Sequence, residues 1–190
     1  MAAVSQLTGR ITQCLYGIYL KNKILWGVKN LRYRACSLCI IKRRESILLE
    51  HFPEEDGIIT FRPVGGTIEY GEDSKSAVIR EVKEEINIDI IEPKLIGIIE
   101  HIFPWYGEIG HEYDFIYEAS FSRMDDYNKN EFEGIEGDKK FIAVWKSLDD
   151  FEENLQYKLV PDCLYEMLTS GQISDIKHIN TKDLLAFKGS

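Results

Sequence analysis

Glycine turns give way to a helical pattern in residues 65–88, which read GGTIEYGEDSKSAVIREVKEEINI. The segment opens with a glycine pair and a Gly-Glu-Asp turn. After the turn, apolar residues recur three or four positions apart, as they do on one face of an α-helix. They are Val78, Ile79, Val82 and Ile86. Asp73 or Ser74 can cap the start of this helix. We therefore predict a loop, a helix and a second loop.

Three glutamates occupy positions i, i+3 and i+4 of the predicted helix: Glu81, Glu84 and Glu85. Their carboxylates therefore share one face. A solvated acidic face is one interpretation of this pattern. The preceding glycine pair favours a different one, because backbone carbonyl groups of the loop can approach a cation that the glutamates also bind. Ligand sets made of oxygen alone select hard cations, Mg²⁺ first and Mn²⁺ second.

The segment resembles the signature of the Nudix hydrolases, G-x5-E-x7-R-E-U-x-E-E-x-G-U, where U is an apolar residue. The matching positions are Gly66, Glu72, Arg80, Glu81, Val82, Glu84, Glu85 and Ile88. Asn87 stands where the signature has its last glycine. That position closes the helix, where a left-handed backbone is wanted, and Asn is the next best residue for it.

The resemblance implies an α/β fold, the Nudix-type α/β/α sandwich with a mixed β-sheet, over residues 31–170. Residues 1–30 are then a basic N-terminal extension and residues 171–190 a C-terminal tail. The extension is expected to pack on the domain or on a second copy of the chain, as in a homodimer.

The resemblance also implies a division of roles in the site. Glu81, Glu84 and Glu85 would hold the metal, assisted by the backbone carbonyl of Gly65. Arg80 would bind carboxylate oxygens and orient a glutamate. The general base varies between members of the family. Glu112 is the first candidate, and the alternatives are Glu131, Glu133, Glu136 and Glu81 itself.

Three further residues are candidates for substrate binding. Arg62 precedes the glycine loop and could hold a substrate phosphate, although a surface ion pair is the alternative. Trp105 and Tyr106 lie in a turn-rich connection, residues 104–111, and could stack a nucleobase. Alternatively, they cover the core.

Members of the family hydrolyse a diphosphate bond in a nucleoside diphosphate linked to another group. The sequence is therefore interpreted as a Mg²⁺-dependent hydrolase of a substrate such as ADP-ribose or a nucleotide sugar. One alternative is a pyrophosphohydrolase of nucleoside triphosphates, and another is a non-catalytic module that binds a nucleotide.

Charge and cysteine content limit the partners. The net charge of -9 argues against binding of bulk nucleic acid or an anionic membrane through a general positive field. No apolar run in residues 1–30 approaches the roughly 20 residues that span a bilayer. Cys36 and Cys39 have C-x-x-C spacing without a second pair, which favours buried reduced thiols and a cytoplasmic protein.

The rest of the chain reads mainly as strands. The predicted strands are 33–41, 46–52, 57–62, 94–103, 112–121 and 141–146. Residues 125–140 are acidic and poor in apolar residues, which predicts a mobile loop. Pro161 is predicted to open a last helix that runs to Leu168.

Overall fold

The computed structural model describes residues 32–52, 57–105, 108–137, 139–170 and 176–180. The chain splits into two compact units, Met1–Leu31 and Arg32–Ser190. All described residues belong to the second unit. The proposed extension, residues 1–30, and the candidate Tyr106 therefore lie outside the described residues.

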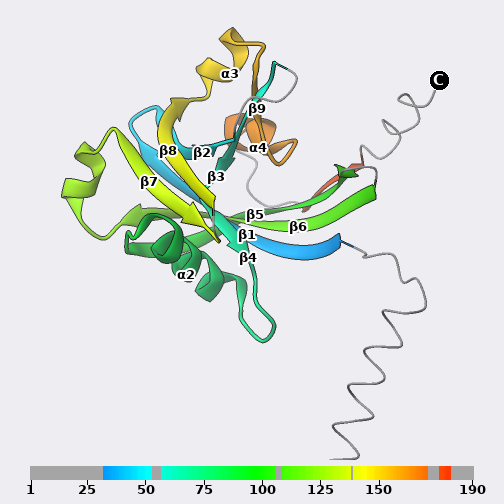
Figure 1. Ribbon diagram of the computed structural model, residues 1–190, viewed down its shortest axis with the longest axis horizontal. Helices are drawn as coiled ribbons and strands as arrows, with labels where there is room; N and C mark the ends of the chain where they lie inside the picture. The colour runs from blue at the N-terminus through cyan, green and yellow to red at the C-terminus, as the bar shows by residue number, and fades with distance from the viewer. Residues whose placement is uncertain (1–31, 53–56, 106–107, 138, 171–175, 181–190) are drawn as a thin grey trace, which may run out of the picture. The chain divides into compact units, whose positions relative to one another are not determined.

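One mixed sheet of ten strands organises the described part of the chain (Figure 1). The strands are β1 (Arg32–Arg43), β2 (Ser46–His51), β3 (Ile59–Pro63), β4 (Gly65–Thr67), β5 (Ile90–Trp105), β6 (Glu108–Phe121), β7 (Glu131–Glu136), β8 (Lys139–Ser147), β9 (Tyr157–Leu159) and β10 (Ile176–Asn180). The helical segments are α2 (Ser74–Ile86), η1 (Met124–Asn128), α3 (Asp149–Glu153) and α4 (Leu164–Ser170).

The path through the sheet runs β10-β5-β6-β1-β2-β3-β9, with β4 paired to β1 and β8 paired to β2 and β7. The pairs β1–β6, β5–β10 and β3–β9 are parallel, and the other pairs are antiparallel. The predicted mixed sheet is confirmed.

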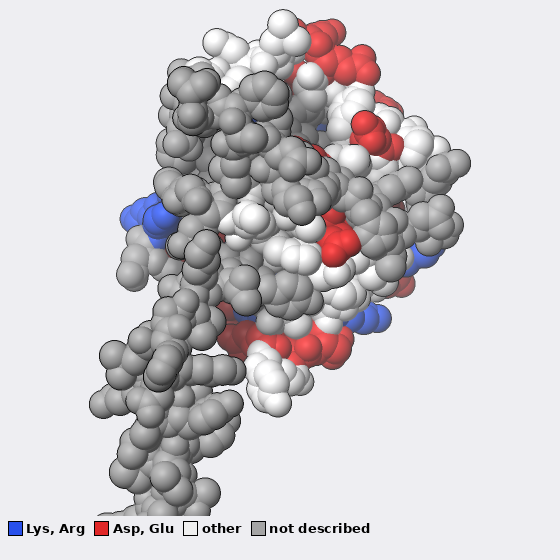
Figure 2. Space-filling view, turned by 90° about the vertical axis from the view of Figure 1, so that its right-hand side faces the viewer, with Lys and Arg blue, Asp and Glu red and all other residues white. Residues whose placement is uncertain are grey.

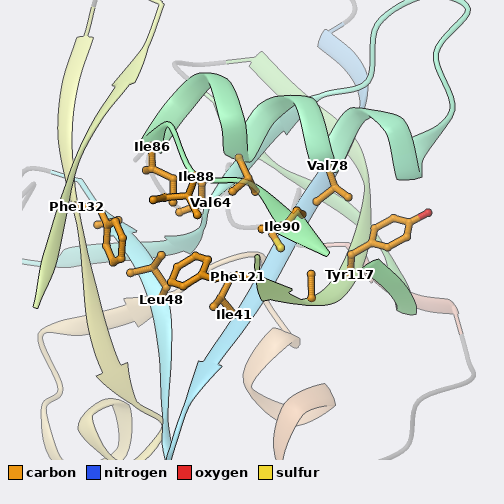
Figure 3. Close-up of a cluster of buried hydrophobic side chains, with 14 residues drawn as sticks. Ile41, Leu48, Val64, Val78, Ile86, Ile88, Ile90, Tyr117, Phe121 and Phe132 are labelled. Carbon is orange, nitrogen blue, oxygen red and sulfur yellow. The ribbon is translucent and has the colours of Figure 1, made fainter. Parts of the chain in front are cut away.

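Both faces of the sheet are buried. Successive residues of a strand point to opposite sides, so one strand contributes side chains to both cores. In β1, Cys39 and Ile41 face the core beneath α2, whereas Leu38 and Ile40 face the core that includes Leu164 of α4. Figure 3 shows the first of these cores, with side chains of α2 above those of the strands. The sheet therefore lies between α2 on one side and α4 on the other.

Two predicted features of α2 are confirmed. The Asp73 carboxylate caps the helix by accepting hydrogen bonds from the backbone N–H groups of Lys75 and Ser76, each at 3.0 Å. Asn87 ends the helix in the left-handed region, with φ 55° and ψ 35°. The departure from the family signature is thus compatible with the backbone that the signature requires.

The prediction of a loop over residues 125–140 is wrong, because this segment contains η1 and β7. The segment has few apolar residues, but one of them, Phe132, packs into the core. Its ring is buried and packs near Phe121 and Trp145, with centroid distances of 5.5 and 6.2 Å. One buried aromatic residue and a hairpin with β8 are enough to hold a strand that is otherwise acidic.

Three boundaries also differ from the predictions. The connection predicted over residues 104–111 is largely strand, since β5 runs to Trp105 and β6 begins at Glu108. The last helix begins at Leu164 rather than Pro161, because Cys163 has φ 68°, outside the helical region. Residues 176–180, interpreted as part of a tail, pair with β5 as β10.

Candidate active site

The start of α2 is fixed to the sheet by two side-chain contacts. Ser37 of β1 donates a hydrogen bond from its hydroxyl to the carbonyl oxygen of Ser74 at 2.7 Å. The hydroxyl of Ser74 lies 2.8 Å from that of Tyr117 on β6. The apolar side of α2 is buried on the same strands. These contacts set where the polar side of the helix meets β4.

Gly65 and Gly66 of β4 lie directly against the glutamates of α2. The backbone N–H of Gly65 donates a hydrogen bond to Oε2 of Glu85 at 2.9 Å. A Cβ atom on Gly66 would lie 2.7 Å from Cδ of Glu81, and one on Gly65 would lie 2.2 Å from the carbonyl oxygen of Ser37. Gly65 also has φ +139°. A side chain at Gly65 would clash with the backbone of β1, and one at Gly66 would displace the carboxylate of Glu81, so the glycine pair lets helix and strand approach this closely.

Arg80 organises the acidic side chains around it. Its Nε and Nη2 atoms donate hydrogen bonds to the two carboxylate oxygens of Glu72 at 2.9 and 2.8 Å. Its Nη1 lies 2.9 Å from Oε1 of Glu81 and 3.0 Å from Oε2 of Glu84. Nη2 also donates to the carbonyl oxygen of Thr67 at 3.1 Å. One planar guanidinium group thus holds three carboxylates and the loop before the helix.

The three glutamates differ in burial. The side chain of Glu84 is 62% exposed, whereas that of Glu81 is 13% exposed and Glu85 is buried. Burial, and then the charge of Glu50, raises the pKa of Glu85 to about 8. Burial likewise raises the pKa of Glu81, against the hydrogen bond from Arg80. In both cases burial outweighs the nearby positive charge, that of Arg80 at Glu81 and that of Arg62 at Glu85.

A divalent cation fits this donor set. The donors are carboxylate oxygens, which suit Mg²⁺ and Mn²⁺. Because Gly66 has no Cβ atom, the carboxylate of Glu81 can lie next to the backbone of β4. Glu81, Glu84 and Glu85 could therefore hold the metal. Their role, and that of the Gly65 carbonyl, stays a prediction.

Figure 2 shows acidic side chains gathered at the lower edge of the molecule, at the level where Figure 1 places α2 and the loop before it. Basic side chains are sparse on the face that Figure 2 presents. Further acidic side chains lie higher on the same face, with uncharged residues between them.

A second group of charged residues lies buried in the sheet, and of these only Arg62 was a candidate from the sequence. Glu50 of β2 is directly opposite Arg62 of β3 in the sheet, and their side chains form an ion pair at 3.6 Å. Asp114 of β6 is also buried. The available signal was an acidic residue inside an apolar strand, which is rare unless the residue is paired.

The candidates for the general base lie on β6 and β7, except for Glu81, which lies on α2. Glu112 lies on β6, where its carboxylate accepts a hydrogen bond from Nε of Arg34 at 2.7 Å. Glu131, Glu133 and Glu136 lie on β7 and are exposed. Trp105 ends β5, opposite Glu108, and its side chain lies outside the described part of the structure.

Comparisons with known proteins agree with this arrangement. The NUDIX domain model matches residues 31–166 of the chain. None of the curated proteins matches it. In the described residues, no helix is long and apolar enough to cross a membrane.

Two solved structures with TM-scores of 0.52 share the fold. A MutT protein from Bacillus halodurans is 22% identical, with a TM-score of 0.52, over 78% of this chain and 92% of that one. A NUDIX hydrolase from Nitrosomonas europaea is 18% identical, also with a TM-score of 0.52, over 74% of this chain and 90% of that one. A MutT NUDIX hydrolase from Burkholderia pseudomallei is 28% identical, with a TM-score of 0.47, over 62% of this chain and 84% of that one.

The match to the family model covers most of the chain, and α2 with its glycine loop supplies the expected geometry. The chain therefore belongs to the NUDIX domain family and is a Nudix pyrophosphohydrolase.

Proposed function

We propose that the chain hydrolyses a diphosphate bond in a nucleoside diphosphate derivative, such as ADP-ribose or a nucleotide sugar, and depends on Mg²⁺. The observation that carries the proposal is the contact between α2 and β4. There, Glu81 lies against Gly66, Glu85 accepts a hydrogen bond from Gly65, and Arg80 binds three carboxylates.

Each charged residue of the site has its own role in the proposed reaction. Glu81, Glu84 and Glu85 bind Mg²⁺, which when bound screens the charge of the diphosphate and lowers the pKa of water. Arg80 holds Glu81 and Glu84 in place through its guanidinium group. Glu72 fixes Arg80 in turn, and this hydrogen bond lowers the pKa of Glu72. Glu72 therefore remains a carboxylate under assay conditions.

The geometry supports Glu136 as the general base among the acids of β7. Side chains of a strand alternate between its two faces, so Glu136 shares the face of the buried Phe132 and Glu133 lies on the opposite face. The charge of Glu136 acts on Glu50, and the charge of Glu50 acts on Glu85. Glu136 is thus electrostatically linked to the site on α2.

Glu112 is less suited to this role, because Arg34 binds its carboxylate at 2.7 Å. The Oε1 oxygen of Glu112 is therefore already occupied by a hydrogen bond. Changing Glu136 to Gln should lower kcat about 100-fold, whereas Glu133→Gln should change it less than about twofold. A large loss in Glu112→Gln with normal turnover in Glu136→Gln would assign the role to Glu112 instead.

The proposed reaction is tested by a substrate panel with Mg²⁺ and detection of released phosphate compounds. The panel contains ADP-ribose, nucleotide sugars and nucleoside triphosphates, so it also separates the alternative of triphosphate hydrolysis. Glu84→Gln should abolish hydrolysis while the protein stays folded, because the side chain is largely exposed. Glu118→Gln is the matched control, since Glu118 is an exposed glutamate in an ion pair with Lys42 on a different part of the surface.

Three outcomes would overturn the proposal. Turnover of Glu84→Gln near the parental rate would contradict the proposed metal-binding role of the glutamates. Calorimetry that detects no binding of Mg²⁺ or Mn²⁺ would show that the acidic face of α2 is merely solvated. A parent protein that binds nucleotides and metal but hydrolyses nothing in the panel would be a binding module.

A further inference from the structure

One thiol and two carboxylates come together on the strands β1 and β6. Cys36, Glu112 and Asp114 each offer a donor atom, and the three atoms lie within 4.8 Å of one another. Asp114 is directly opposite Cys36 in the parallel pair of strands, and Glu112 precedes Asp114 by two residues. Because side chains alternate along a strand, all three point to the same face of the sheet. The fold thus assembles a group of one sulfur donor and two oxygen donors.

This group lies on the side of the sheet that faces away from α2. Cys36 belongs to the core that includes Leu164 of α4, whereas α2 packs on the other core. The glutamates of α2 contact Gly65 and Gly66 instead. A cation held by the thiol and the two carboxylates would therefore be distinct from the proposed Mg²⁺ ion.

Asp114 lacks a contact that its burial demands. The residue is 2% exposed, and its Oδ1 atom has no hydrogen-bond partner among the described residues. Buried polar atoms in proteins almost always have one. The charge of Arg62 attracts this carboxylate, but the guanidinium group of Arg62 already pairs with Glu50 at 3.6 Å. A cation between Asp114 and the other two donors would supply the missing contact.

The charges around the group balance when a divalent cation is added. Arg34 holds Oε1 of Glu112 at 2.7 Å and leaves Oε2 for an ion. The charge of Arg62 is offset by Glu50. Two carboxylates and a thiolate would then face the divalent cation and Arg34, which carry equal and opposite charge. A buried site without excess charge avoids much of the free-energy cost of burying ions.

The donor types favour zinc over magnesium. Zn²⁺ binds thiolate and carboxylate ligands and often takes three of them plus a water, whereas Mg²⁺ requires oxygen ligands. Zinc bonds of roughly 2.0–2.3 Å place neighbouring ligand atoms roughly 3–4 Å apart. Donor atoms that lie within 4.8 Å need shifts of only about 1 Å to reach that spacing.

Zinc would replace the proton of the Cys36 thiol. Burial raises the pKa of this thiol to about 11, so it stays protonated without a metal. A metal ion binds the thiolate, and the displaced proton leaves to solvent. The side chains of Glu112 and Arg34 are 13% and 41% exposed, so the group reaches solvent at that end. The ion can enter there and the proton can leave.

We propose that Cys36, Glu112 and Asp114 form a zinc site in the sheet, separate from the glutamates of α2. Zinc takes Sγ of Cys36, Oε2 of Glu112 and a carboxylate oxygen of Asp114, and water takes the fourth position. Because the ion binds the folded chain and joins β1 to β6, it stabilises the folded state. The site does not depend on the proposed hydrolysis, so either proposal can fail without the other.

The first test uses Co²⁺ as a spectroscopic substitute for zinc. A thiolate ligand gives Co²⁺ a charge-transfer band in the near ultraviolet, which carboxylate ligands alone do not produce. The full chain is stripped of metal with EDTA, desalted, and titrated with Co²⁺ in excess Mg²⁺, with thiols kept reduced by a phosphine. The band should appear, saturate at equal concentrations of metal and protein, and disappear when Zn²⁺ is added.

Variants then identify the ligands. Cys36→Ser should lose the band. Asp114→Asn and Glu112→Gln should each weaken zinc binding at least about tenfold, because losing a group that merely supports a ligand already costs about 10–100-fold. Cys39→Ala is the matched control, since Cys39 lies on the same strand but in the other core, and it should keep the band. Glu118→Gln, an exposed change on β6, should also bind zinc as the parent does.

The second test measures stability. Thermal unfolding of the parent and of each variant is followed in excess Mg²⁺, with EDTA-treated protein and with Zn²⁺ at 100 times its Kd. Bound zinc should raise the Tm of the parent by roughly 5–10 °C. It should raise that of Cys36→Ser and Asp114→Asn much less. The unfolding transitions without zinc also show which variants are folded, and any one folded variant allows the comparison.

Four outcomes would overturn the zinc site. A parent without the thiolate band would mean that water alone fills the space between the donors. A band that Cys36→Ser retains, or that Cys39→Ala removes, would place the ion on another thiol. Zinc affinity that Asp114→Asn and Glu112→Gln both retain would give Cys36 other partners. Equal stabilisation of the parent and all folded variants would mean that zinc binds elsewhere.

Discussion

Gly66 and Glu81 are in contact so close that no side chain fits between them: a Cβ atom on Gly66 would lie 2.7 Å from Cδ and Oε2 of Glu81. Changing Gly66 to Ala must therefore move the Glu81 carboxylate. We expect kcat to fall about 100-fold, as displacements near 1 Å do in active sites. Stability should fall by less than about 1 kcal/mol, because only the end of the flexible Glu81 side chain has to move. Steady-state kinetics and urea unfolding measure the two effects.

Gly137→Asn is the matched control for this variant. Gly137 has open space around it, and its φ of +58° is one that Asn tolerates. The control should keep parental activity. If Gly66→Ala also keeps it, then the position of Glu81 is not critical for catalysis.

Arg80 to Lys is expected to impair catalysis although it conserves charge. Lysine cannot reproduce the paired hydrogen bonds to Glu72 while also reaching Glu81 and Glu84. Because these contacts orient the glutamates, kcat or apparent Mg²⁺ affinity should fall about 10–100-fold. Kinetics over a range of Mg²⁺ concentrations distinguish a fall in kcat from a fall in apparent Mg²⁺ affinity. Lys83→Arg is the control, because Lys83 lies one turn along the same helix and pairs with Asp89; it should have little effect. Full activity of Arg80→Lys would show that the Arg80 guanidinium group is not needed to orient the glutamates.

The sequence predicted the parts of the site that lie close together along the chain. The spacing of Glu81, Glu84 and Glu85 sets their common face on a helix, and Asp73 and Asn87 mark its ends through local chemistry. These features depend on contacts within one or two turns, so they can be derived without the rest of the fold.

The buried cluster could not be derived in this way. Glu50 and Asp114 are separated by more than sixty residues, and both act on Arg62 only because β2, β3, β1 and β6 are neighbours in one sheet. The strand β7 was missed for a related reason. Its local composition is acidic, and a tertiary contact through Phe132 overrides that preference.

Asn87 offers a test of the departure from the family signature. Its backbone has φ 55°, where Ala is strained and Gly is not. Asn87→Gly should stay within about 0.5 kcal/mol of the parent, whereas Asn87→Ala should lose about 1 kcal/mol. Chemical unfolding provides both values. Equal stability of the Ala and Gly variants would show that the left-handed cap contributes little to the folded state.

The burial of Glu50 predicts a pH dependence of stability. Burial raises the pKa of Glu50 from 4.5 to about 7. The charge of Arg62 opposes this shift, and the charge of Glu136 adds to it. Below pH 4.5 the carboxyl is protonated in both folded and unfolded chains, so it adds no penalty. As the pH rises from 4.5 to 7, the unfolded chain releases this proton first, and the folded state loses stability relative to it.

Glu50→Gln removes this titration and leaves a neutral group of similar shape. The variant should match the parent near pH 4 and exceed it by about 2 kcal/mol at pH 8. Urea unfolding in EDTA from pH 4 to pH 8 measures the difference, with the exposed Glu118→Gln as control. A difference that stays constant with pH would mean that the Glu50 carboxylate is not penalised by burial. A variant that loses stability as the pH rises would mean that the attraction of Arg62 outweighs the desolvation of Glu50.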